Sequence, residues 1–468
     1  MKHIITPLIF SFAVFVNAAV AQQVRMAPDS MEDVRLSFAP IVSETAPAVV
    51  NVFATRTVRQ QSRRSPFMND PFFRRFFGDD AFGMPRERVQ NSLGSGVIVG
   101  PDGVVVTNNH VIEGGDAFKV VLSDRREFDA ELILADDKTD LAVLKIDAGN
   151  EALPFLSFAD SDTAEVGDVV LAVGNPFGVG QTVTTGIVSA LARTQVGVSD
   201  YQFFIQTDAA INPGNSGGAL VDIDGRLLGV NTAIFSRSGG SNGIGFAIPA
   251  NMVSRVVSSA VDGGVLARPW LGANTDTVTA ALADTFGLDR PIGAVVTEIY
   301  KGGPADRAGL KRGDIVLSAD GFDIFDSETL RYRLATGETG DEAALTVKRD
   351  GKTRNVRLKL SAPPETPKRD LTDLDGRHPL NGAVAGNLSP AFAEEIGRDL
   401  LDTGVILTGV QGRSVAARYG FRRGDKILTV NGAEVKTVKQ LIRELSRYEA
   451  GWSIELERRG RVLSLNTR

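Results

Sequence analysis

The sequence predicts a mainly β protein of several domains, and three observations lead to this class. The chain has 468 residues, which at the usual size of about 100 to 200 residues per domain corresponds to about three domains. Between residues 94 and 248, short Val- and Ile-rich runs alternate with glycine, aspartate and asparagine, a spacing typical of an antiparallel barrel or sandwich. Residues 304–321 and 415–432 then repeat one pattern, PADRAGLKRGDIVLSADG and VAARYGFRRGDKILTVNG. This domain-sized offset indicates two tandem copies of one module.

The composition excludes several kinds of chemistry. Hydrophobic residues make up 43% and charged residues 23% of the chain, which is typical of a globular protein. The net charge of -6, from 51 basic and 57 acidic residues, gives no support for a nucleic-acid partner. Cysteine is absent, so disulfides, thiolate zinc sites and thiol nucleophiles are excluded. With three histidines, His3, His110 and His378, a multi-histidine metal centre is not expected, and we expect no metal and no cofactor.

The first 21 residues have the pattern of a cleaved signal peptide. Lys2 precedes an apolar stretch, and the small residues Ala19 and Ala21 predict cleavage before Gln22. The alternative is an uncleaved anchor, but the apolar stretch is shorter than the roughly 20 residues that cross a bilayer. We therefore expect an exported protein with no integral membrane span, and residues 1–21 are assigned to the signal peptide.

The remaining chain divides at changes of composition. We expect a first domain over residues 22–262, in which residues 56–90 carry six phenylalanines among arginines and turn formers without a sustained period. Such a segment predicts a mobile aromatic loop that contacts another subunit or a substrate. The first repeated module is expected over residues 266–361. Three prolines then mark a linker over residues 362–377, and the second module is expected over residues 378–468.

The segment TDAAINPGNSGGAL, residues 207–220, carries the strongest sign of chemistry. A serine between glycines, Ser216, allows a close approach of backbone N–H groups to a reacting atom. G-N-S-G-G also satisfies the nucleophile elbow of α/β hydrolases, but that elbow runs into a helix. Here GALVDIDGRLLGVNTA indicates a strand, an Asp-Gly turn and a second strand. The elbow alternative would also need His378, which lies at the end of the linker, so we do not favour it.

His110 is the best candidate for a general base in the mature chain. It ends the apolar run VVVTNNH, where a side chain can be presented on a rigid strand edge. Its alternative interpretation is a structural histidine. Asp140 directly precedes the apolar strand LAVLKI and is the candidate acid, whereas Asp136 and Asp137 are expected to be solvated.

His110, Asp140 and Ser216 follow one another in the chymotrypsin order. The segments GSGVIVGPDGVVVTNNHVI, TDLAVLKI and TDAAINPGNSGGALVDIDGRLLGVNTAI resemble those of the HtrA (Deg, protease Do) family of serine endopeptidases. The two repeated modules are similar to PDZ domains, so the resemblance covers nearly the whole mature chain. It implies a chymotrypsin-like double β-barrel protease domain followed by two PDZ-like α+β domains.

The expected roles follow from the need for an activated hydroxyl. Ser216 would attack the scissile carbonyl, His110 would transfer its proton to the leaving amine, and Asp140 would fix the histidine tautomer and stabilise the imidazolium. The N–H groups of Gly214 and Ser216 would form the oxyanion hole. Asn215 stands where digestive relatives carry an acid, so we expect other segments of the chain to order this loop.

The resemblance also predicts a peptide site in the first module. Leu271, Gly272 and Ala273 stand at the position of the family's carboxylate-binding loop, where a turn can present N–H groups to a chain terminus while a strand edge pairs with the peptide. A plain turn that opens a β domain is the alternative. In the second module NGAVAGNLS is a weaker candidate, and assembly contacts there are equally expected.

The expected function is that of an ATP-independent serine endopeptidase that degrades unfolded or misfolded exported proteins. Its PDZ modules would bind peptide C-termini or exposed apolar segments. The resemblance implies trimers or multiples of trimers and a periplasmic location. Two alternatives remain open: a chaperone or holdase in which proteolysis is secondary, and a scaffold that only tethers partners. Gly351-Lys352-Thr353 resembles the end of a P-loop, but Thr346 replaces its first glycine, so no nucleotide site is predicted.

Overall fold

The computed structural model describes residues 37–58, 88–176, 180–193, 203–212, 214–234, 241–263, 266–447 and 451–467. The predicted signal peptide and the centre of the predicted aromatic loop lie outside these residues, so both stay predictions. The first described elements are α1 (Ala39–Thr45) and the 3₁₀ turn η2 (Ala46–Ala48). They lead directly into the first strand, β1.

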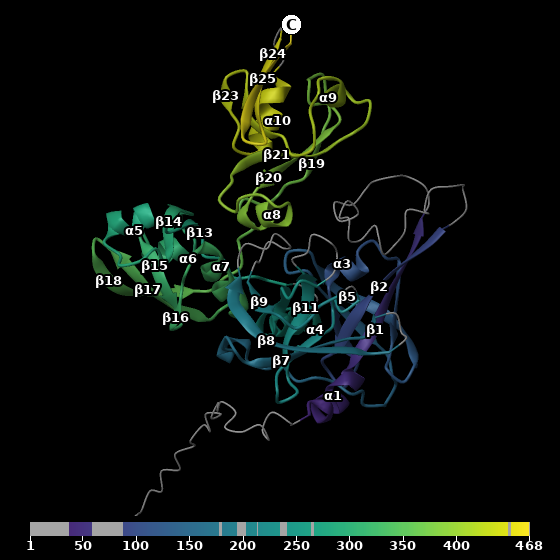
Figure 1. Cartoon of the computed structure of the whole chain (residues 1–468). Helices are drawn as coiled ribbons and strands as arrows, with labels where there is room; N and C mark the ends of the chain where they lie inside the picture. Colours follow the sequence, from purple (N-terminus) through teal and green to yellow (C-terminus); the bar gives the residue numbers. More distant parts are fainter. Residues whose placement is uncertain are drawn as a thin grey trace, which may run out of the picture. The chain divides into compact units, whose positions relative to one another are not determined.

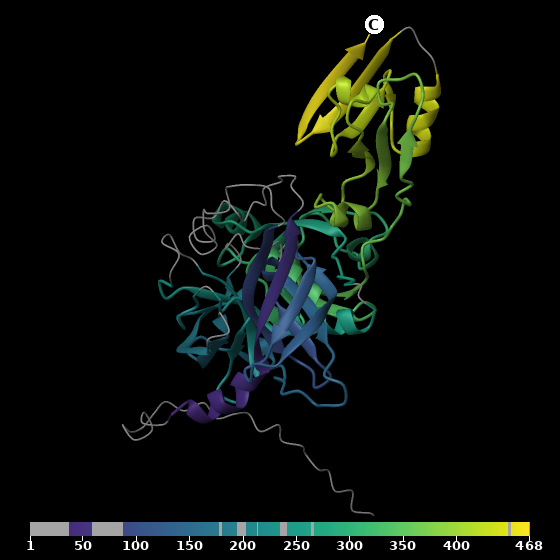
Figure 2. The same cartoon turned by 90° about the vertical axis from the view of Figure 1, so that its right-hand side faces the viewer.

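A closed six-stranded antiparallel barrel follows (Figures 1 and 2). Its strands, in spatial order, are β1 (Val49–Val58), β2 (Arg88–Ile98), β3 (Val104–Thr107), β6 (Leu141–Ile146), β5 (Glu127–Asp136) and β4 (Ala117–Val121). Pairing of β1, the purple strand of Figure 2, with β4 closes the barrel. Closure leaves no free sheet edge, so the residues at the strand ends are held on a rigid frame.

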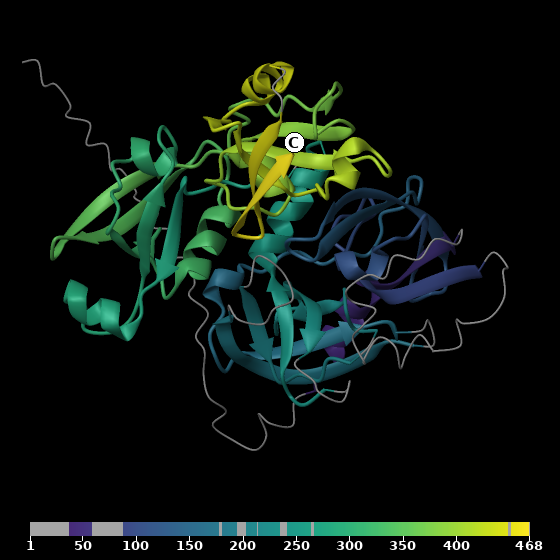
Figure 3. The same ribbon diagram turned by 90° about the horizontal axis from the view of Figure 1, so that it is seen from above.

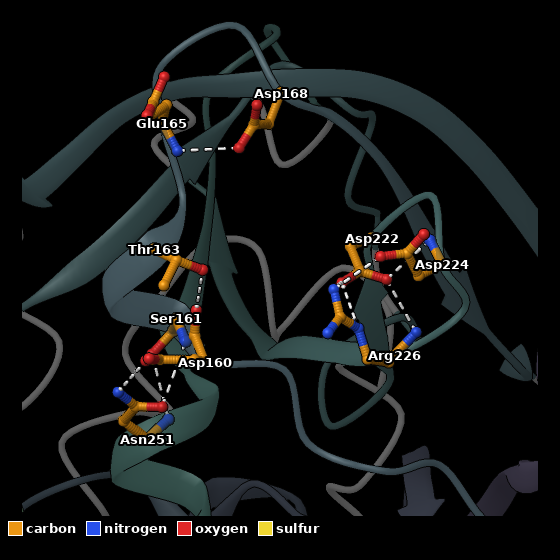
Figure 4. Close-up of polar contacts among 9 residues, drawn as sticks. All are labelled: Asp160, Ser161, Thr163, Glu165, Asp168, Asp222, Asp224, Arg226 and Asn251. Atoms are coloured by element: carbon orange, nitrogen blue, oxygen red, sulfur yellow. Dashed lines mark hydrogen bonds and ion pairs between the residues drawn. The ribbon is translucent and has the colours of Figure 1, made fainter. Parts of the chain in front are cut away.

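A second closed six-stranded barrel is built in the same way. Its strands, in spatial order, are β10 (Ala219–Val221), β11 (Leu227–Ile234), β12 (Gly245–Pro249), β9 (Phe204–Thr207), β8 (Thr182–Arg193) and β7 (Val169–Gly174). Figure 4 shows the turn between β10 and β11, where Asp222 accepts hydrogen bonds from the backbone N–H of Arg226 at 2.9 Å and from its Nε at 3.0 Å. Gly225 adopts a positive φ of 77° in this turn. A side chain there would be strained.

The helix after the last strand of the second barrel is hydrogen-bonded to the turn that precedes the first strand of this barrel. Helix α4 (Ala250–Val261) starts where β12 ends, and the 3₁₀ turn η5 (Ser161–Thr163) precedes β7. Asn251 exchanges hydrogen bonds with Ser161 at 3.2 and 3.1 Å and donates to Asp160 at 2.8 Å (Figure 4). One buried apolar cluster contains residues of both barrels and of α4. The barrels therefore share a core, which fixes the loops between them.

Two PDZ-like modules follow the barrels, and five strands of each sheet share one spatial order (Figure 1). The first contains β13 (Ala273–Thr277), β14 (Ala294–Ile299), β15 (Ile315–Ala319), β17 (Glu342–Arg349) and β18 (Lys352–Lys359), with the short β16 (Phe322–Asp323) on β15. Its helices are α5 (Ala280–Phe286), α6 (Pro304–Arg307) and α7 (Ser327–Thr336).

The second module repeats this sheet and adds one strand at its edge. Its strands are β19 (Thr372–Leu374), β20 (Ala383–Leu388), β21 (Gly404–Val410), β22 (Lys426–Val430), β24 (Trp452–Arg458) and β25 (Arg461–Thr467), with β23 (Ala433–Glu434) on β22. Its helices are α8 (Pro390–Glu395), α9 (Val415–Arg418) and α10 (Val438–Ser446). In Figure 3 the yellow strands nearest the carboxyl terminus belong to this module. The additional strand is β19.

In both modules, the aspartate of the repeated sequence motif forms an ion pair with an arginine of a later strand. Asp314 accepts hydrogen bonds from Nε and Nη2 of Arg349, both at 2.5 Å, and Asp425 accepts the equivalent pair from Arg458 at 2.6 and 2.7 Å. Both aspartates are fully buried. The bidentate geometry is the strong form of this interaction. The aspartate of the repeated motif therefore joins its turn to a later strand of the same sheet.

One expectation about the carboxylates was wrong. Asp137 is exposed, but Asp136 is buried instead of solvated. Its carboxylate accepts hydrogen bonds from the backbone N–H and hydroxyl of Thr139 and pairs with Arg268. A buried carboxylate needs such partners, and the distant Arg268 could not be assigned to it from the local sequence.

Candidate active site

His110 and Asp140 come together at one end of the first barrel. His110 lies in the short helix α3 (Asn109–Ile112) after β3, and Asp140 ends the turn before β6. Asp140 has a positive φ of 57°, and its carbonyl oxygen accepts hydrogen bonds from the backbone N–H of Asn109 at 3.1 Å and from Nδ2 of Asn108 at 3.0 Å. These contacts fix the turn that carries the carboxylate.

The carboxylate of Asp140 holds both the backbone and the ring of His110. Its Oδ1 accepts the His110 N–H at 3.0 Å, and its Oδ2 lies 2.8 Å from His110 Nδ1. This contact favours the tautomer with the proton on Nδ1 and leaves Nε2 as the basic atom. Burial lowers the pKa of His110, but the charge and the hydrogen bond of Asp140, together with the charge of Glu113, raise it by more. The net pKa is above the ordinary value of histidine.

Ser216 is connected to this pair through Thr232. Ser216 lies in the turn before β10 of the second barrel, and its Oγ donates a hydrogen bond to the Thr232 carbonyl at 3.2 Å. The Thr232 hydroxyl donates to Asp140 Oδ2 at 2.6 Å. Thr232 is buried and lies at a register irregularity of β11. Sequence reasoning missed this residue, because nothing in GVNTAI marks the hydroxyl as pointing towards an acid of the other barrel.

A serine of the first barrel supports the backbone around Ser216. The fully buried Ser95, in β2, donates from Oγ to the Gly214 carbonyl at 2.5 Å and accepts the Asn175 N–H at 2.8 Å. Its own N–H donates to the Ser216 carbonyl at 2.9 Å. Asn215 is buried beside these groups. The loop therefore receives support from another segment, in line with the expectation drawn from Asn215.

Two glycines of this loop cannot be replaced without movement of the backbone. A Cβ on Gly217, whose φ is +82°, would lie 2.1 Å from the Ser95 carbonyl oxygen. A Cβ on Gly214, whose φ is +95°, would lie 2.4 Å from Pro176 Cβ. Within the described part of the chain, the N–H groups of Gly214 and Ser216 donate to no protein acceptor. Both N–H groups could therefore donate hydrogen bonds to the oxyanion of a substrate.

The predicted peptide loop of the first module forms a tight turn before an edge strand. The Leu271 carbonyl accepts the Ala305 N–H at 2.9 Å, and the Gly272 carbonyl accepts the Tyr300 N–H at 2.9 Å. Gly272 has a φ of +73°, and Ala273 starts β13. Among the described strands, β13 pairs only with β14. The arrangement offers a strand edge next to a glycine turn.

The described residues contain no group of three or more histidine, cysteine, aspartate or glutamate side chains that could hold a metal ion. Over the same residues, no helix is long and apolar enough to cross a membrane.

Comparison with known proteins identifies the two kinds of domain. A model of the trypsin-like peptidase domain matches residues 94–230, and a PDZ-domain model matches residues 269–360. Among solved structures, the HtrA-type protease AlgW with a decapeptide is 47% identical, with a TM-score of 0.52, and covers 70% of this chain and 99% of that one. AlgW with a tripeptide is 44% identical, with a TM-score of 0.53 and coverages of 71% and 99%.

Curated relatives match over nearly the whole chain. A probable periplasmic serine endoprotease, DegP-like, of Marinomonas sp. (strain MWYL1) is 39% identical, over 90% of this chain and 90% of its own. The protein of the same name from Halomonas elongata is 39% identical, with coverages of 94% and 92%. A probable periplasmic serine protease, do/HhoA-like, of Haemophilus influenzae is 38% identical, with coverages of 94% and 93%.

The two closed barrels, together with the matched trypsin-like peptidase and PDZ domains, define a chymotrypsin-like serine endopeptidase that carries PDZ-like modules. The similarity over nearly the full length is more specific: the chain belongs to the HtrA family of serine endoproteases. The predicted fold class, the enzyme class and the family resemblance are confirmed. The predicted site residues and the predicted domain boundaries stay predictions.

Proposed function

We propose that His110, Asp140 and Ser216 form the catalytic triad of an ATP-independent endopeptidase that degrades unfolded or misfolded exported proteins. The observation that carries this proposal is the hydrogen-bonded connection across the two barrels. His110 Nδ1 lies 2.8 Å from Asp140 Oδ2, which accepts the Thr232 hydroxyl at 2.6 Å, while Ser216 Oγ donates to the Thr232 carbonyl at 3.2 Å. The three predicted residues thus meet around one buried threonine.

The proposed mechanism assigns one role to each of these groups. His110 Nε2 accepts the proton of Ser216 Oγ as that oxygen attacks the substrate carbonyl, and the imidazolium is stabilised by Asp140. The N–H groups of Gly214 and Ser216 bind the negative charge that develops on the carbonyl oxygen. His110 then protonates the leaving amine, and water releases the acyl group by the reverse sequence of proton transfers.

Substrate selection is assigned to the first PDZ-like module. A peptide would extend the sheet at the free edge of β13, and its terminal carboxylate would accept hydrogen bonds from the turn at Leu271, Gly272 and Ala273. Gly272 has a positive φ, and a Cβ at this position would lie only 2.6 Å from Pro304 Cδ. Both observations support a turn of fixed shape. The HtrA-type protease AlgW has been solved with a decapeptide and with a tripeptide, which supports a peptide ligand for this module.

Export to the periplasm, with removal of residues 1–21, is part of the proposal. It is supported by the signal-peptide pattern and by the periplasmic names of the relatives. Assembly into trimers or multiples of trimers is proposed from the family resemblance. The chaperone or holdase alternative is not favoured, because the relatives are named as endoproteases and His110 is hydrogen-bonded to Asp140.

The experiment compares the purified mature chain with its Ser216→Ala variant on a reduced, unfolded protein in the absence of ATP. We expect the parent chain to produce peptide fragments and the variant to produce none, with both retaining the same thermal unfolding. Equal cleavage by both proteins would contradict the role of Ser216. Suppression of aggregation by both without cleavage by either would favour the holdase alternative.

A further inference from the structure

The second module differs from the first at the sheet edge where a peptide would add. In the first module β13 is the terminal strand of the described sheet, but its counterpart β20 is not. Strand β19 pairs with β20 in antiparallel orientation, with Thr372 opposite Ala385 and Leu374 opposite Ala383 (Figure 1). The chain's own residues thus occupy the edge that is open in the first module.

Backbone hydrogen bonds establish which residues of the two modules correspond. The Asn381 carbonyl accepts the Ala416 N–H at 3.0 Å, as Leu271 accepts that of Ala305. The Gly382 carbonyl accepts the Gln411 N–H at 2.8 Å, and the φ of Gly382 is +83° against +73° for Gly272. The turn at residues 381–383 is therefore the structural equivalent of the predicted carboxylate-binding turn at residues 271–273.

Residues 368–374, which we call the internal segment, follow β20 along its length. At one end the Gly382 N–H donates to the Leu374 carbonyl at 2.8 Å, and at the other the Asn387 N–H donates to the Arg369 carbonyl at 2.6 Å. Because the segment is antiparallel to β20, its C-terminal end lies next to the turn. A peptide ligand whose terminal carboxylate binds at that turn would have the same direction. The Leu374 carbonyl accepts the N–H of the turn glycine, a hydrogen bond that one oxygen of a terminal carboxylate could also accept.

Side chains anchor both ends of the internal segment. Leu374 is 2% exposed and packs in the apolar core of the second module. At the other end Arg369 pairs with Glu395 of α8 at 2.8 Å, and its guanidinium lies 5.0 Å from the centre of the Phe392 ring. A buried apolar residue next to the turn is how an extended peptide gains affinity beyond its main-chain hydrogen bonds.

Asn387 provides an attachment that the first module lacks. Its Nδ2 donates to the Lys368 carbonyl at 2.8 Å, and its Oδ1 accepts the Val438 N–H at the start of α10 at 2.7 Å. The equivalent residue of the first module, Thr277, accepts the N–H of Ser327 at the start of α7 in the same way. Threonine reproduces the helix contact, but it must accept and donate at one oxygen, so it cannot reach the two separate partners that Oδ1 and Nδ2 of asparagine reach. Asn387 therefore retains the segment specifically.

We propose that the internal segment is a built-in ligand of the second PDZ-like module, which closes that module's peptide site to external C-terminal peptides while the segment is in place. Displacement of the segment would open a site for an extended peptide that ends in an apolar residue. The two modules then differ in function, because among the described residues no strand pairs with the outer edge of β13, whereas β19 pairs with β20. This inference does not depend on proteolysis, so failure of the proposed peptidase activity would leave it intact.

Hydrogen exchange read by mass spectrometry tests the proposal in the full Ser216→Ala chain, which avoids self-cleavage. We expect residues 382–387 to exchange more slowly than the equivalent residues 272–277, by about tenfold at Gly382 and Asn387, because each of these N–H groups is hydrogen-bonded to the segment. Equal exchange in the two stretches would overturn the proposal. This comparison needs no mutation in either module, so a folding defect cannot obscure it.

A variant then tests whether the segment excludes other ligands. Asn387→Thr copies the first module and should speed exchange over residues 382–387 towards that of 272–277. A synthetic peptide KRDLTDL with a free carboxylate should then slow exchange at 382–387 in the variant but not in the parent, and its C-terminal amide should have a weaker effect. Thr277→Ser is the matched control and should leave 382–387 unchanged. Equal protection of 382–387 by the peptide in parent and variant would overturn the proposal.

Discussion

Thr232 is expected to position the catalytic carboxylate, and its hydroxyl can be removed with little change of shape. In Thr232→Val a methyl group replaces the hydroxyl that donates to Asp140 Oδ2 at 2.6 Å. This distance is typical of a charge-assisted O–H···O⁻ hydrogen bond. Both residues are buried, so water does not replace the lost donor readily. The carbonyl of residue 232, which accepts from Ser216, is retained.

The magnitude follows from the strength of this hydrogen bond. Bonds to charged groups contribute about 1.5 to 3 kcal/mol, which corresponds to a factor of about 10 to 150 in rate if the whole contribution is needed when the imidazolium of His110 forms. We therefore expect kcat/KM to fall by up to about 100-fold, mainly through kcat. KM should change little, because Thr232 is buried and is not among the residues proposed to contact the substrate.

The assay is steady-state cleavage of a peptide substrate by the parent, Thr232→Val and Thr232→Ser, with thermal unfolding measured alongside. Thr232→Ser retains the hydroxyl and should keep most of the activity, which separates the hydrogen bond from a packing effect. The reasoning is refuted if Thr232→Val stays within about twofold of the parent, or if the valine and serine variants lose equal activity.

Three further predictions concern the supports of the site and of the second module. Ser95→Ala leaves the Gly214 carbonyl unpaired and should lower kcat by about 10- to 100-fold in the same peptide assay; unchanged kcat would contradict it. Asp425→Asn breaks the pair with the quarter-exposed Arg458 and should destabilise the second module by about 3 kcal/mol in urea unfolding; a loss below about 1 would contradict it. Because His110 must be neutral to act and its pKa is raised, kcat/KM should fall on acidification with a midpoint above about 6.5; a lower midpoint would contradict this sign.

The fold class could be predicted because its signals are local, and the candidate site residues were selected from signals of the same kind. The strand, turn and strand after Ser216 excluded the α/β-hydrolase alternative, and β10 and β11 with their Asp-Gly turn occupy those residues. Because the chain has only three histidines, His110 is the main candidate base. Asp140 was chosen as the candidate acid because it directly precedes the apolar strand LAVLKI. The structure brings His110 and Asp140 into direct contact.

What the sequence did not reveal are contacts between residues far apart in the chain. Ser95 precedes Gly214 by 119 positions, and Thr232 follows Asp140 by 92. No periodicity or turn signal links such residues, because their contact depends on how the two barrels pack. Asp136 was misjudged for the same reason, since its partner Arg268 is 132 positions away.

The second module shows a related limit of sequence reasoning. NGAVAGNLS is only a weak match to a carboxylate-binding turn, yet the hydrogen bonds of Gly382 make it the equivalent of the turn at Gly272. The linker before it was predicted from its prolines, but its pairing with β20 depends on a sheet edge that the sequence does not display. Topology therefore revealed both the turn and the segment that covers it.

The most direct test of the central claim is covalent labelling of the nucleophile. A fluorophosphonate probe, which reacts with serine hydroxyls activated by a general base, is incubated with the parent chain, Ser216→Ala and His110→Ala, and the modified peptide is identified by mass spectrometry. We expect one adduct on Ser216 in the parent, none in Ser216→Ala, and labelling slowed by about 100-fold or more in His110→Ala. An adduct on another serine, or a labelling rate unaffected by His110→Ala, would contradict the proposed triad.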